Sequence, residues 1–180
     1  MVLETERLIL RPWEADDAKE LFRYASSPNV GPIAGWPVHT SVENSGEIIK
    51  NVLSVPETFA IVWKETNLPI GSVGLKMGDA TDLTDAQDEC EVGYWLGVPY
   101  WGRGIMPEAV QEILRYAFED MGMNKVWCGY YDGNDKSKRV QEKCGFHYEW
   151  TTENVDVPLM NEKRTGHVNS LSKETWMKCK

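Results

Sequence analysis

Residues 92–106 read VGYWLGVPYWGRGIM, and this stretch decides the fold. Its first part belongs to a run over 90–98 that is rich in β-forming residues and predicts a strand. Pro99 bounds that strand, and Gly102 and Gly104 follow in a turn. Pro107 stands early in the next segment, where a helix tolerates the missing N–H. The stretch therefore predicts a strand, a glycine turn and a helix over 106–121.

Such a turn is a candidate anion site. The first N–H groups of a helix lack intrahelical partners and carry partial positive charge, which suits a phosphate. Gly102 and Gly104 let the backbone come close to a ligand. No Lys-Ser/Thr pair follows Gly104, which excludes a Walker loop, and no third glycine follows at the spacing of a dinucleotide fingerprint. These residues alone fit an anion site or a plain tight turn equally well.

The rest of the chain supplies antiparallel hairpins first and a strand–helix–strand crossover later, a pattern typical of an α+β fold. We expect a mixed, mostly antiparallel sheet of about seven strands flanked by about four helices, in one domain over 1–180. The other predicted strands cover 7–11, 58–64, 70–77, 126–131, 146–151 and 167–171. The other predicted helices cover 14–25, 42–53 and 134–144, and segments 28–37 and 78–87 are expected to be loops.

Composition narrows the class of function. The chain has 28 acidic and 19 basic residues, a formal net charge of −9, which argues against a nucleic-acid partner and is compatible with a cationic substrate or with solubility alone. We expect neither a membrane span nor a targeting segment, and a cytoplasmic location. Four cysteines without a CxxC pair and three histidines predict no metal site.

A second segment, NDKSKRVQEKCGF at 134–146, follows the next predicted strand. Residues 101–106 resemble the Q/R-x-x-G-x-G/A pyrophosphate loop of the GNAT family of N-acetyltransferases. Residues 134–146 resemble its N-x-x-S/A…K-x-G-F helix. The runs TERLILRP at 5–12 and EVGYWL at 91–96 are similar to the RimJ/RimL branch, which acetylates protein N-termini and some small amines. The four motifs occur in family order over nearly the whole chain.

The resemblance implies acetyl-CoA as acetyl donor, with no metal, and it assigns residues to the cofactor. The pyrophosphate would lie on Trp101, Gly102, Arg103, Gly104, Ile105 and Met106. Backbone groups of Leu96 and Val98 would hold the pantetheine arm, and Asn134 and Ser137 would face the cofactor.

Three positions depart from the family pattern. Trp101 stands where Gln or Arg is frequent, and Met106 replaces the final small residue. Gln141 occupies the position where many members carry a tyrosine that protonates the leaving thiolate. Because the family binds pyrophosphate mainly through backbone N–H groups, the first two changes are compatible with binding. Because of the third change, the residue that protonates the leaving thiolate is in question. We expect Ser137 to act as the substitute proton donor.

The chemistry also needs an unprotonated amine. We expect Glu91 to act as base, directly or through a water, although a carboxylate that only solubilises the strand end fits the sequence nearly as well. An α-amino group is roughly a tenth unprotonated at pH 7, far more than a lysine amine, so a site with one base favours an α-amine. Trp36, in a Pro/Gly loop, is the expected aromatic contact to substrate.

Three readings follow. The first is an enzyme that transfers acetyl to the α-amine of a protein or peptide N-terminus, by direct attack in a ternary complex. The second is an antibiotic or polyamine acetyltransferase on the same fold. The third, from another class, is an acetyl-CoA-binding module without turnover. The sequence leaves a homodimer open.

Overall fold

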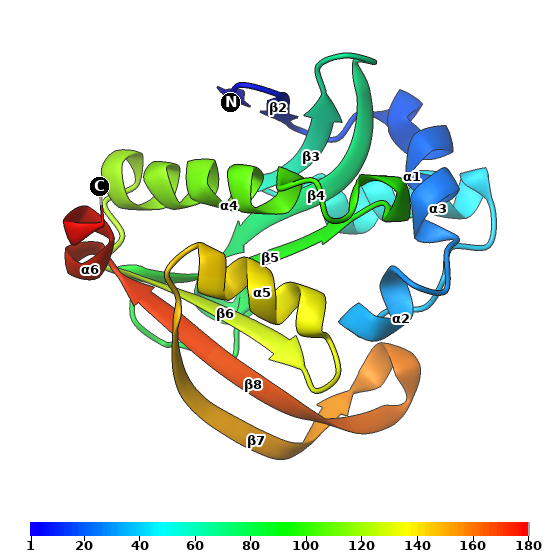
Figure 1. Ribbon diagram of the computed structural model, residues 1–180. Helices are drawn as coiled ribbons and strands as arrows, with labels where there is room; N and C mark the ends of the chain where they lie inside the picture. The colour runs from blue at the N-terminus through cyan, green and yellow to red at the C-terminus, as the bar shows by residue number, and fades with distance from the viewer. Residues whose placement is uncertain (180) are drawn as a thin grey trace.

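The computed structural model describes residues 1–179 and is built on an eight-stranded sheet in the order β1-β2-β3-β4-β5-β6-β8-β7 (Figure 1). Its strands are β1 (Leu3–Glu4), β2 (Leu8–Arg11), β3 (Thr58–Trp63), β4 (Leu68–Lys76), β5 (Glu89–Leu96), β6 (Lys125–Tyr131), β7 (His147–Val157) and β8 (Glu162–Ser172). Its α-helices are α1 (Ala18–Ala25), α2 (Gly31–Ala34), α3 (Val42–Ile48), α4 (Ile105–Arg115), α5 (Asp135–Lys143) and α6 (Lys173–Lys178).

The sheet is antiparallel everywhere except between β5 and β6. These two parallel strands are joined by the crossover through α4, as the sequence pattern predicted. Their pairing covers only Glu89–Glu91 against Lys125–Trp127, at the start of each strand. Beyond Glu91 the two strands carry no ladder between them, so the sheet opens into a fork in its middle.

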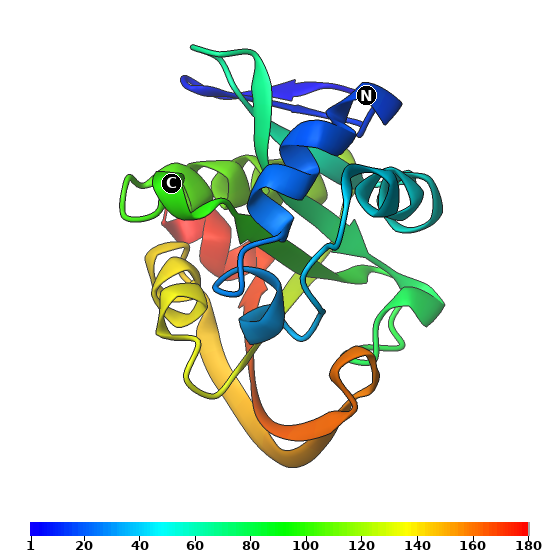
Figure 2. The same ribbon diagram turned by 90° about the vertical axis from the view of Figure 1, so that its right-hand side faces the viewer.

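Both faces of the sheet are covered, and β3 shows why. Phe59, Ile61 and Trp63 pack in the larger core cluster with residues of α4, whereas Ala60 and Val62 pack in a second cluster with α1. Side chains of a strand alternate between faces, so a strand buried on both faces is apolar throughout. Figure 2 shows α4 and α5 on one side of the sheet and α3 on the other.

The expected α+β class and mixed sheet are confirmed, but the counts differ: the described residues form eight strands and six α-helices. β1 has only two residues, too short for a detectable alternation. β7 and β8 each extend to 11 residues, beyond the predicted 146–151 and 167–171. The added parts are mostly polar and either exposed or half-buried except for Val157, so no apolar pattern marked them. α2 lies inside the predicted loop 28–37, and α6 follows β8.

The two helices that frame the fork begin and end as predicted. α4 continues as a helical turn over Tyr116–Asp120, and Gly122, at φ +75°, follows its end. The Asn134 side chain caps α5 by accepting a hydrogen bond from the Ser137 N–H at 3.3 Å. Gly145, at φ +88°, ends α5.

No helix within residues 1–179 is long and apolar enough to cross a membrane. In the same range, no cluster of three or more His, Cys, Asp or Glu side chains is arranged to hold a metal ion.

Candidate functional site

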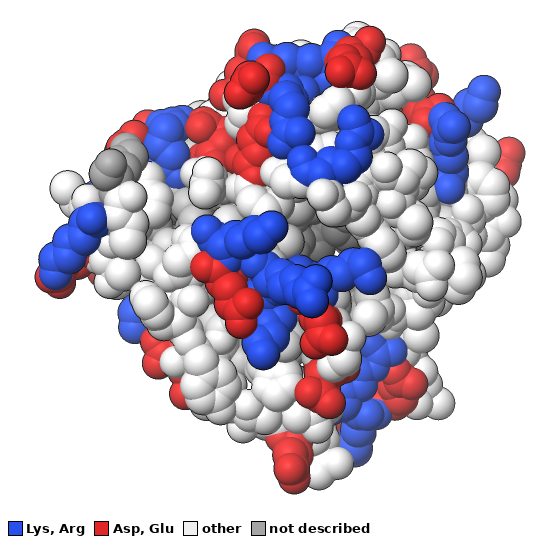
Figure 3. All heavy atoms as spheres, viewed as in Figure 1, with Lys and Arg blue, Asp and Glu red and all other residues white. Residues whose placement is uncertain are grey.

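A cavity of about 560 Å³ lies where β5 ends, α4 begins and α5 passes over the fork. The segment 28–34, which leads into α2, closes a further side. The hollow opens on the face shown in Figure 3, with Lys and Arg side chains gathered beside it. Lining residues that the sequence singled out are Leu96, Trp101, Gly102, Gly104, Ile105, Met106, Asn134 and Ser137.

The glycine turn has the backbone geometry that an anion site needs. Gly102 and Gly104 have φ of +73° and +72°, the left-handed region that side chains disfavour. A Cβ added at Gly102 would have no atom within 4 Å, so open space lies in front of the turn. Gly104 is the N-cap of α4, and the N–H groups of Ile105 and Met106 begin the helix without intrahelical partners. Backbone donors therefore face an accessible cavity.

Trp101 anchors the turn to the strand before it. Its indole Nε1 donates a hydrogen bond to the Leu96 carbonyl at 2.8 Å. The Lys136 ammonium lies 4.6 Å from the centroid of its ring, which brings α5 over the turn. Trp101, which stands where Gln or Arg is usual in the family, thus stabilises the turn through its own side chain.

Glu108, in the first turn of α4, braces this turn against the N-terminal segment. Its carboxylate accepts hydrogen bonds from Thr5 Oγ1 at 2.5 Å, from the Arg7 N–H at 2.9 Å and from Arg7 Nε at 2.6 Å. Burial alone would raise the pKa of Glu108, but these hydrogen bonds and the Arg7 charge together lower it. Arg7 also donates to the Arg103 carbonyl at 3.0 Å. The run at 5–12 therefore fixes the start of α4.

The rim of the cavity is basic although the chain is acidic. Lys136, Arg139 and Lys143 line it from one side of α5, and Asp135 is the acidic residue of that helix in the lining. Their spacing of three and four residues puts them on one helical face. A cavity with backbone donors at one end and three cations along one wall suits a ligand that carries several phosphate charges.

The inner end of the cavity is made of side chains. Tyr94, on β5, reaches across to α5, and its hydroxyl lies 3.0 Å from Ser137 Oγ. Both residues line the cavity. Gln141, one helical turn after Ser137, is only 1 % exposed. Burial raises the pKa of Tyr94 well above 10, so its phenol stays protonated near neutrality.

Glu91 occupies the root of the fork, because it is the last paired residue of β5 against Trp127 of β6. Its carboxylate is half-buried and bonded on both oxygens, to Lys76 Nζ at 3.1 Å and to Thr81 Oγ1 at 2.7 Å. Along β5 it shares a face with Gly93 and Trp95, opposite to Tyr94. It is not among the residues that line the cavity.

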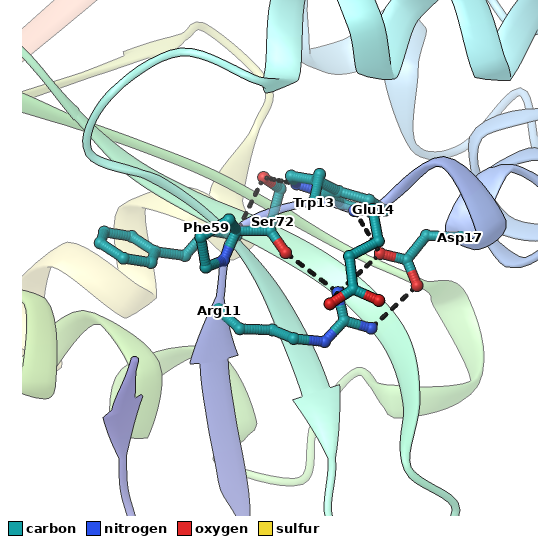
Figure 4. A network of polar contacts seen from close by, with 7 residues as sticks. Arg11, Trp13, Glu14, Asp17, Phe59 and Ser72 are labelled. Carbon is teal, nitrogen blue, oxygen red and sulfur yellow. Dashed lines mark hydrogen bonds and ion pairs between the residues drawn. The ribbon is translucent and has the colours of Figure 1, made fainter. Parts of the chain in front are cut away.

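An aromatic group supports the cavity from the opposite face of the sheet. Trp95 lines the cavity and stacks on Trp13, with ring centroids 6.3 Å apart. Trp13 Nε1 donates to Ser72 Oγ at 3.1 Å, which in turn donates to the Phe59 carbonyl at 3.0 Å (Figure 4).

The turn that presents Trp13 is itself pinned. Arg11 makes two hydrogen bonds to the Asp17 carboxylate, at 2.7 and 2.8 Å, and Asp17 also accepts from the Glu14 N–H at 2.9 Å (Figure 4). Asp17 is buried, so this bidentate pair is geometrically fixed. The polar network thereby holds the indole that supports Trp95.

Trp36 lies behind this group. Its ring meets Trp95 edge-on at 5.9 Å and fills the space beside Gly31, where an added Cβ would come within 2.4 Å of the indole. It does not line the cavity itself. α2 is held further by Arg164 of β8, whose guanidinium donates to the Pro32 carbonyl at 2.7 Å.

The structure therefore gathers most of the predicted cofactor residues around one cavity but leaves some outside. Val98 and Arg103 are not in its lining; Arg103 instead lies over the rings of Trp63 and Tyr100. Sequence reasoning missed Tyr94, which it counted only as a β former, and the basic wall. The wall had a signal in the helical spacing of its three cations, whereas Tyr94 had none.

Comparison with known proteins identifies the family to which the chain is similar. Residues 7–147 match the family model described as acetyltransferase (GNAT) domain. The chain is 33 % identical over 152 residues to the uncharacterized N-acetyltransferase p20 of Bacillus licheniformis, covering 82 % of this chain and 83 % of that protein.

Solved structures agree on the fold. A GNAT-family acetyltransferase from Bacillus anthracis superposes with a TM-score of 0.84 at 22 % identity, over 97 % of this chain and 99 % of that one. The ribosomal-protein-S5-alanine acetyltransferase of Vibrio fischeri gives 0.72 at 22 % identity, over 98 % of both chains. With the family model covering most of its length, the chain belongs to the GNAT family and is an N-acetyltransferase.

Proposed function

We propose that this N-acetyltransferase moves the acetyl group of acetyl-CoA to the α-amine at the N-terminus of a protein or peptide. The choice of acetyl-CoA as the acetyl donor rests on the cavity. It combines an open glycine turn at the start of a helix with the row of cations Lys136, Arg139 and Lys143 on α5. GNAT enzymes use acetyl-CoA, and its pyrophosphate and 3′-phosphate need this combination of backbone donors and cations.

The turn at 101–106 would hold the pyrophosphate through N–H groups, with Asn134 and Ser137 facing the arm of the cofactor. Leu96 and Val98 would meet the pantetheine through their backbone. The Leu96 carbonyl already accepts a hydrogen bond from Trp101 Nε1, and the Val98 carbonyl accepts one from the Trp101 N–H at 3.1 Å. Each of these two carbonyl oxygens therefore has one lone pair left for the pantetheine. Bound here, acetyl-CoA supplies an acetyl group activated as a thioester.

Glu91 is the proposed base. Its place at the root of the fork brings it next to the gap in the sheet, on the face opposite to Tyr94. Lys76 and Thr81 both donate hydrogen bonds to the carboxylate. A site with a single base favours an acceptor that is already partly unprotonated, and an α-amine with a pKa near 7.7–8.0 meets that condition roughly a hundredfold or more better than a lysine side chain.

Acceptor selectivity is tested by thiol release with a matched panel. One peptide is offered with a free N-terminus, with an Nα-acetyl block and a free lysine, and with both amines free. Spermidine and an aminoglycoside complete the panel. We expect turnover only where the α-amine is free. An alanine N-terminus is a sensible first choice, because the Vibrio fischeri neighbour is a ribosomal-protein-S5-alanine acetyltransferase.

Faster turnover of spermidine or the aminoglycoside would favour the small-molecule reading. Binding of acetyl-CoA in calorimetry, with no thiol release from any amine, would favour a module that binds acetyl-CoA without turnover. The predicted contact between Trp36 and the acceptor is tested on the same panel, since Trp36→Phe should change acceptor KM more than the affinity for acetyl-CoA.

A further inference from the structure

The cavity reaches both faces of the sheet at the fork. Tyr94 and Trp95 are consecutive on β5, so their side chains lie on opposite faces, and both residues line the cavity. Beyond Glu91 no ladder joins β5 to β6, and Figure 1 shows the two strands diverging from there. A donor that enters on one face can therefore meet an acceptor that enters on the other.

The two faces suit different reactants. α4 and α5 lie on one side of the sheet (Figure 2), and with them lie the turn at 101–106 and the three cations of α5, which suit the phosphates of the donor. Glu91, the proposed base, lies on the other face together with Trp95. The acceptor amine has to reach both the acetyl group and the base. We therefore expect the acceptor to approach from the face of Glu91.

The strand register places two glycines opposite each other on that face. Glu91 pairs with Trp127 at the root of the fork. Two residues further along each strand, where the ladder has ended, Gly93 stands on β5 and Gly129 on β6. Because side chains alternate along a strand, both positions are on the face of Glu91. At this level of the fork, neither strand carries a side chain on the acceptor's face.

Neither the backbone conformation nor the neighbouring atoms require glycine at these two positions. Gly93 and Gly129 are not among the glycines with positive φ. A Cβ added at Gly93 would have Lys76 Cε as its nearest neighbour, at 3.7 Å. One added at Gly129 would have the His167 carbonyl oxygen at 3.7 Å, so both have ordinary van der Waals room. Glycine weakens the interior of a strand, and it often marks a place where a ligand approaches closely.

We call Gly93 and Gly129 the glycine window, and aromatic rings frame it. Gly129 is exposed and Gly93 half-buried, so solvent reaches the face in front of them. The next residues on this face are Trp95 on β5 and Tyr131 on β6. Trp95 packs against two other indoles, and the guanidinium of Arg164 lies 5.2 Å from the ring centroid of Tyr131. Because these rings are held by their neighbours, the free width of the window depends on what stands at positions 93 and 129.

We propose that the glycine window determines which amines are accepted, by leaving room for the branched α-carbon of an N-terminal residue. This inference rests on the acetyl transfer to an α-amine proposed above. An α-amine stands on a carbon that also bears a side chain and the first peptide carbonyl. It is therefore wider at its reacting end than the unbranched methylene chain of a lysine or a polyamine. The acceptor class that fits is a peptide N-terminus whose first residue has a side chain.

The test varies the window and the first residue of the acceptor together. Peptides that differ only in an N-terminal Gly, Ala or Val are assayed with wild type, Gly93→Ala and Gly129→Ala. Each variant narrows the window by one methyl group, which clashes with the first side chain of the peptide. The loss in kcat/KM should be small with N-terminal glycine, roughly tenfold with alanine and larger with valine, as expected for one methyl group too many in a rigid site.

Three controls separate a steric effect from damage to the fold or to the donor site. Alanine restricts the unfolded chain more than glycine, so the melting temperature of both variants should equal or exceed that of wild type. The dissociation constant for acetyl-CoA, measured by calorimetry, should not change, because the added methyl group lies on the face away from α5. Gly166→Ala makes the same change on the same face of β8, outside the cavity lining and 3.4 Å from Val155 Cγ2, and should leave all three peptides unaffected.

Should Gly129→Ala fail to fold, Gly93→Ala carries the same comparison. Losses that are absent or equal for the three peptides would overturn the inference, and so would a wild type that accepts only N-terminal glycine. In each of these cases, acetyl transfer by the wild type to an α-amine would keep the proposed function. A wild type that acetylates no α-amine would overturn both, so the two failures are distinguishable.

Discussion

The two ends of the cavity are built in different ways. At the outer end, the turn at 101–106 offers backbone N–H groups, made available by Gly102 and Gly104 at positive φ. At the inner end, Ser137 depends on the side chains of Tyr94 and Gln141, which come from β5 and α5. The outer end is a property of one continuous segment, whereas the inner end exists only once separate elements have packed.

The difference teaches how each end tolerates sequence change. The outer end keeps its geometry with Trp101 in place of the usual Gln or Arg, because N–H groups do not depend on side-chain identity and the indole finds its own partner in the Leu96 carbonyl. The inner end changes its chemistry when one residue changes, because a lost donor leaves a buried partner unsatisfied. Side-chain changes should therefore be costly at the inner end and small at the outer end, unless they alter the backbone.

The largest expected effect is at Glu91, at the root of the fork. Glu91→Gln keeps the shape and removes the proton acceptor, so turnover should fall by roughly 10²–10⁴ at neutral pH. The loss should shrink as pH rises, because a growing fraction of the α-amine is then unprotonated without help. A kcat against pH profile for both proteins measures this. A profile for the variant that matches wild type would remove Glu91 from the mechanism.

The next effect sharpens the comparison at the outer end, where only a backbone change should matter. Gly104→Val adds a β-branched side chain at φ +72° in the turn proposed to hold the phosphate, with its Cβ 3.7 Å from Arg7 Nη2. The dissociation constant for acetyl-CoA should rise by roughly tenfold or more, by calorimetry. Gly122→Val is the matched control, since Gly122 has φ +75° and open space but lies outside the cavity lining. Equal affinity of both variants would contradict the phosphate assignment.

The basic wall should matter less than the turn. Replacing Lys136, Arg139 and Lys143 together by Gln should weaken acetyl-CoA binding by roughly tenfold at low salt and by less at physiological salt, where exposed charges are screened. Neutralising Lys19, Lys50 and Lys178, which are exposed and outside the cavity, changes net charge equally. If the two triple variants bind alike, the wall has no specific part in binding.

The smallest effect is expected at the brace under the turn. The pKa of Glu108 is lowered on folding, so its charged form stabilises the fold above the usual value of 4.5, and this contribution is lost as pH falls through the lowered value. Glu108→Gln should lower the melting temperature by about 2–4 °C at pH 7. The gap to wild type should close between pH 4.5 and lower pH in thermal scans. A gap that is independent of pH would show that shape, not charge, is what Glu108 contributes.

The sequence predicted the fold class and most of the outer end, because those signals are local. The strand, the turn and α4 are neighbours along the chain, and so are the cap at Asn134 and the helix that follows it. The polar halves of β7 and β8 escaped prediction, because exposure on both faces removes the alternation that marks a strand. The brace between Thr5, Arg7 and Glu108 escaped as well, since about a hundred residues separate its members.

The inner end shows the same limit in its chemistry. From the sequence, Gln141 was only the residue that stands in place of a tyrosine, and nothing indicated what Ser137 contacts. The structure shows the partners: Gly129 and Asn169 reach Gln141 from two neighbouring strands, and Tyr94 meets Ser137 from the strand across the fork.

By itself, then, the sequence determined the family, the glycine turn and the helix that starts at it, because periodicity, capping and backbone freedom act over a few residues. Only the tertiary structure decided which side chains surround the Ser137 hydroxyl. Hydrogen-bond direction depends on which donors and acceptors meet, and these partners are distant in sequence and meet only where β5, β6, β8 and α5 pack around the fork.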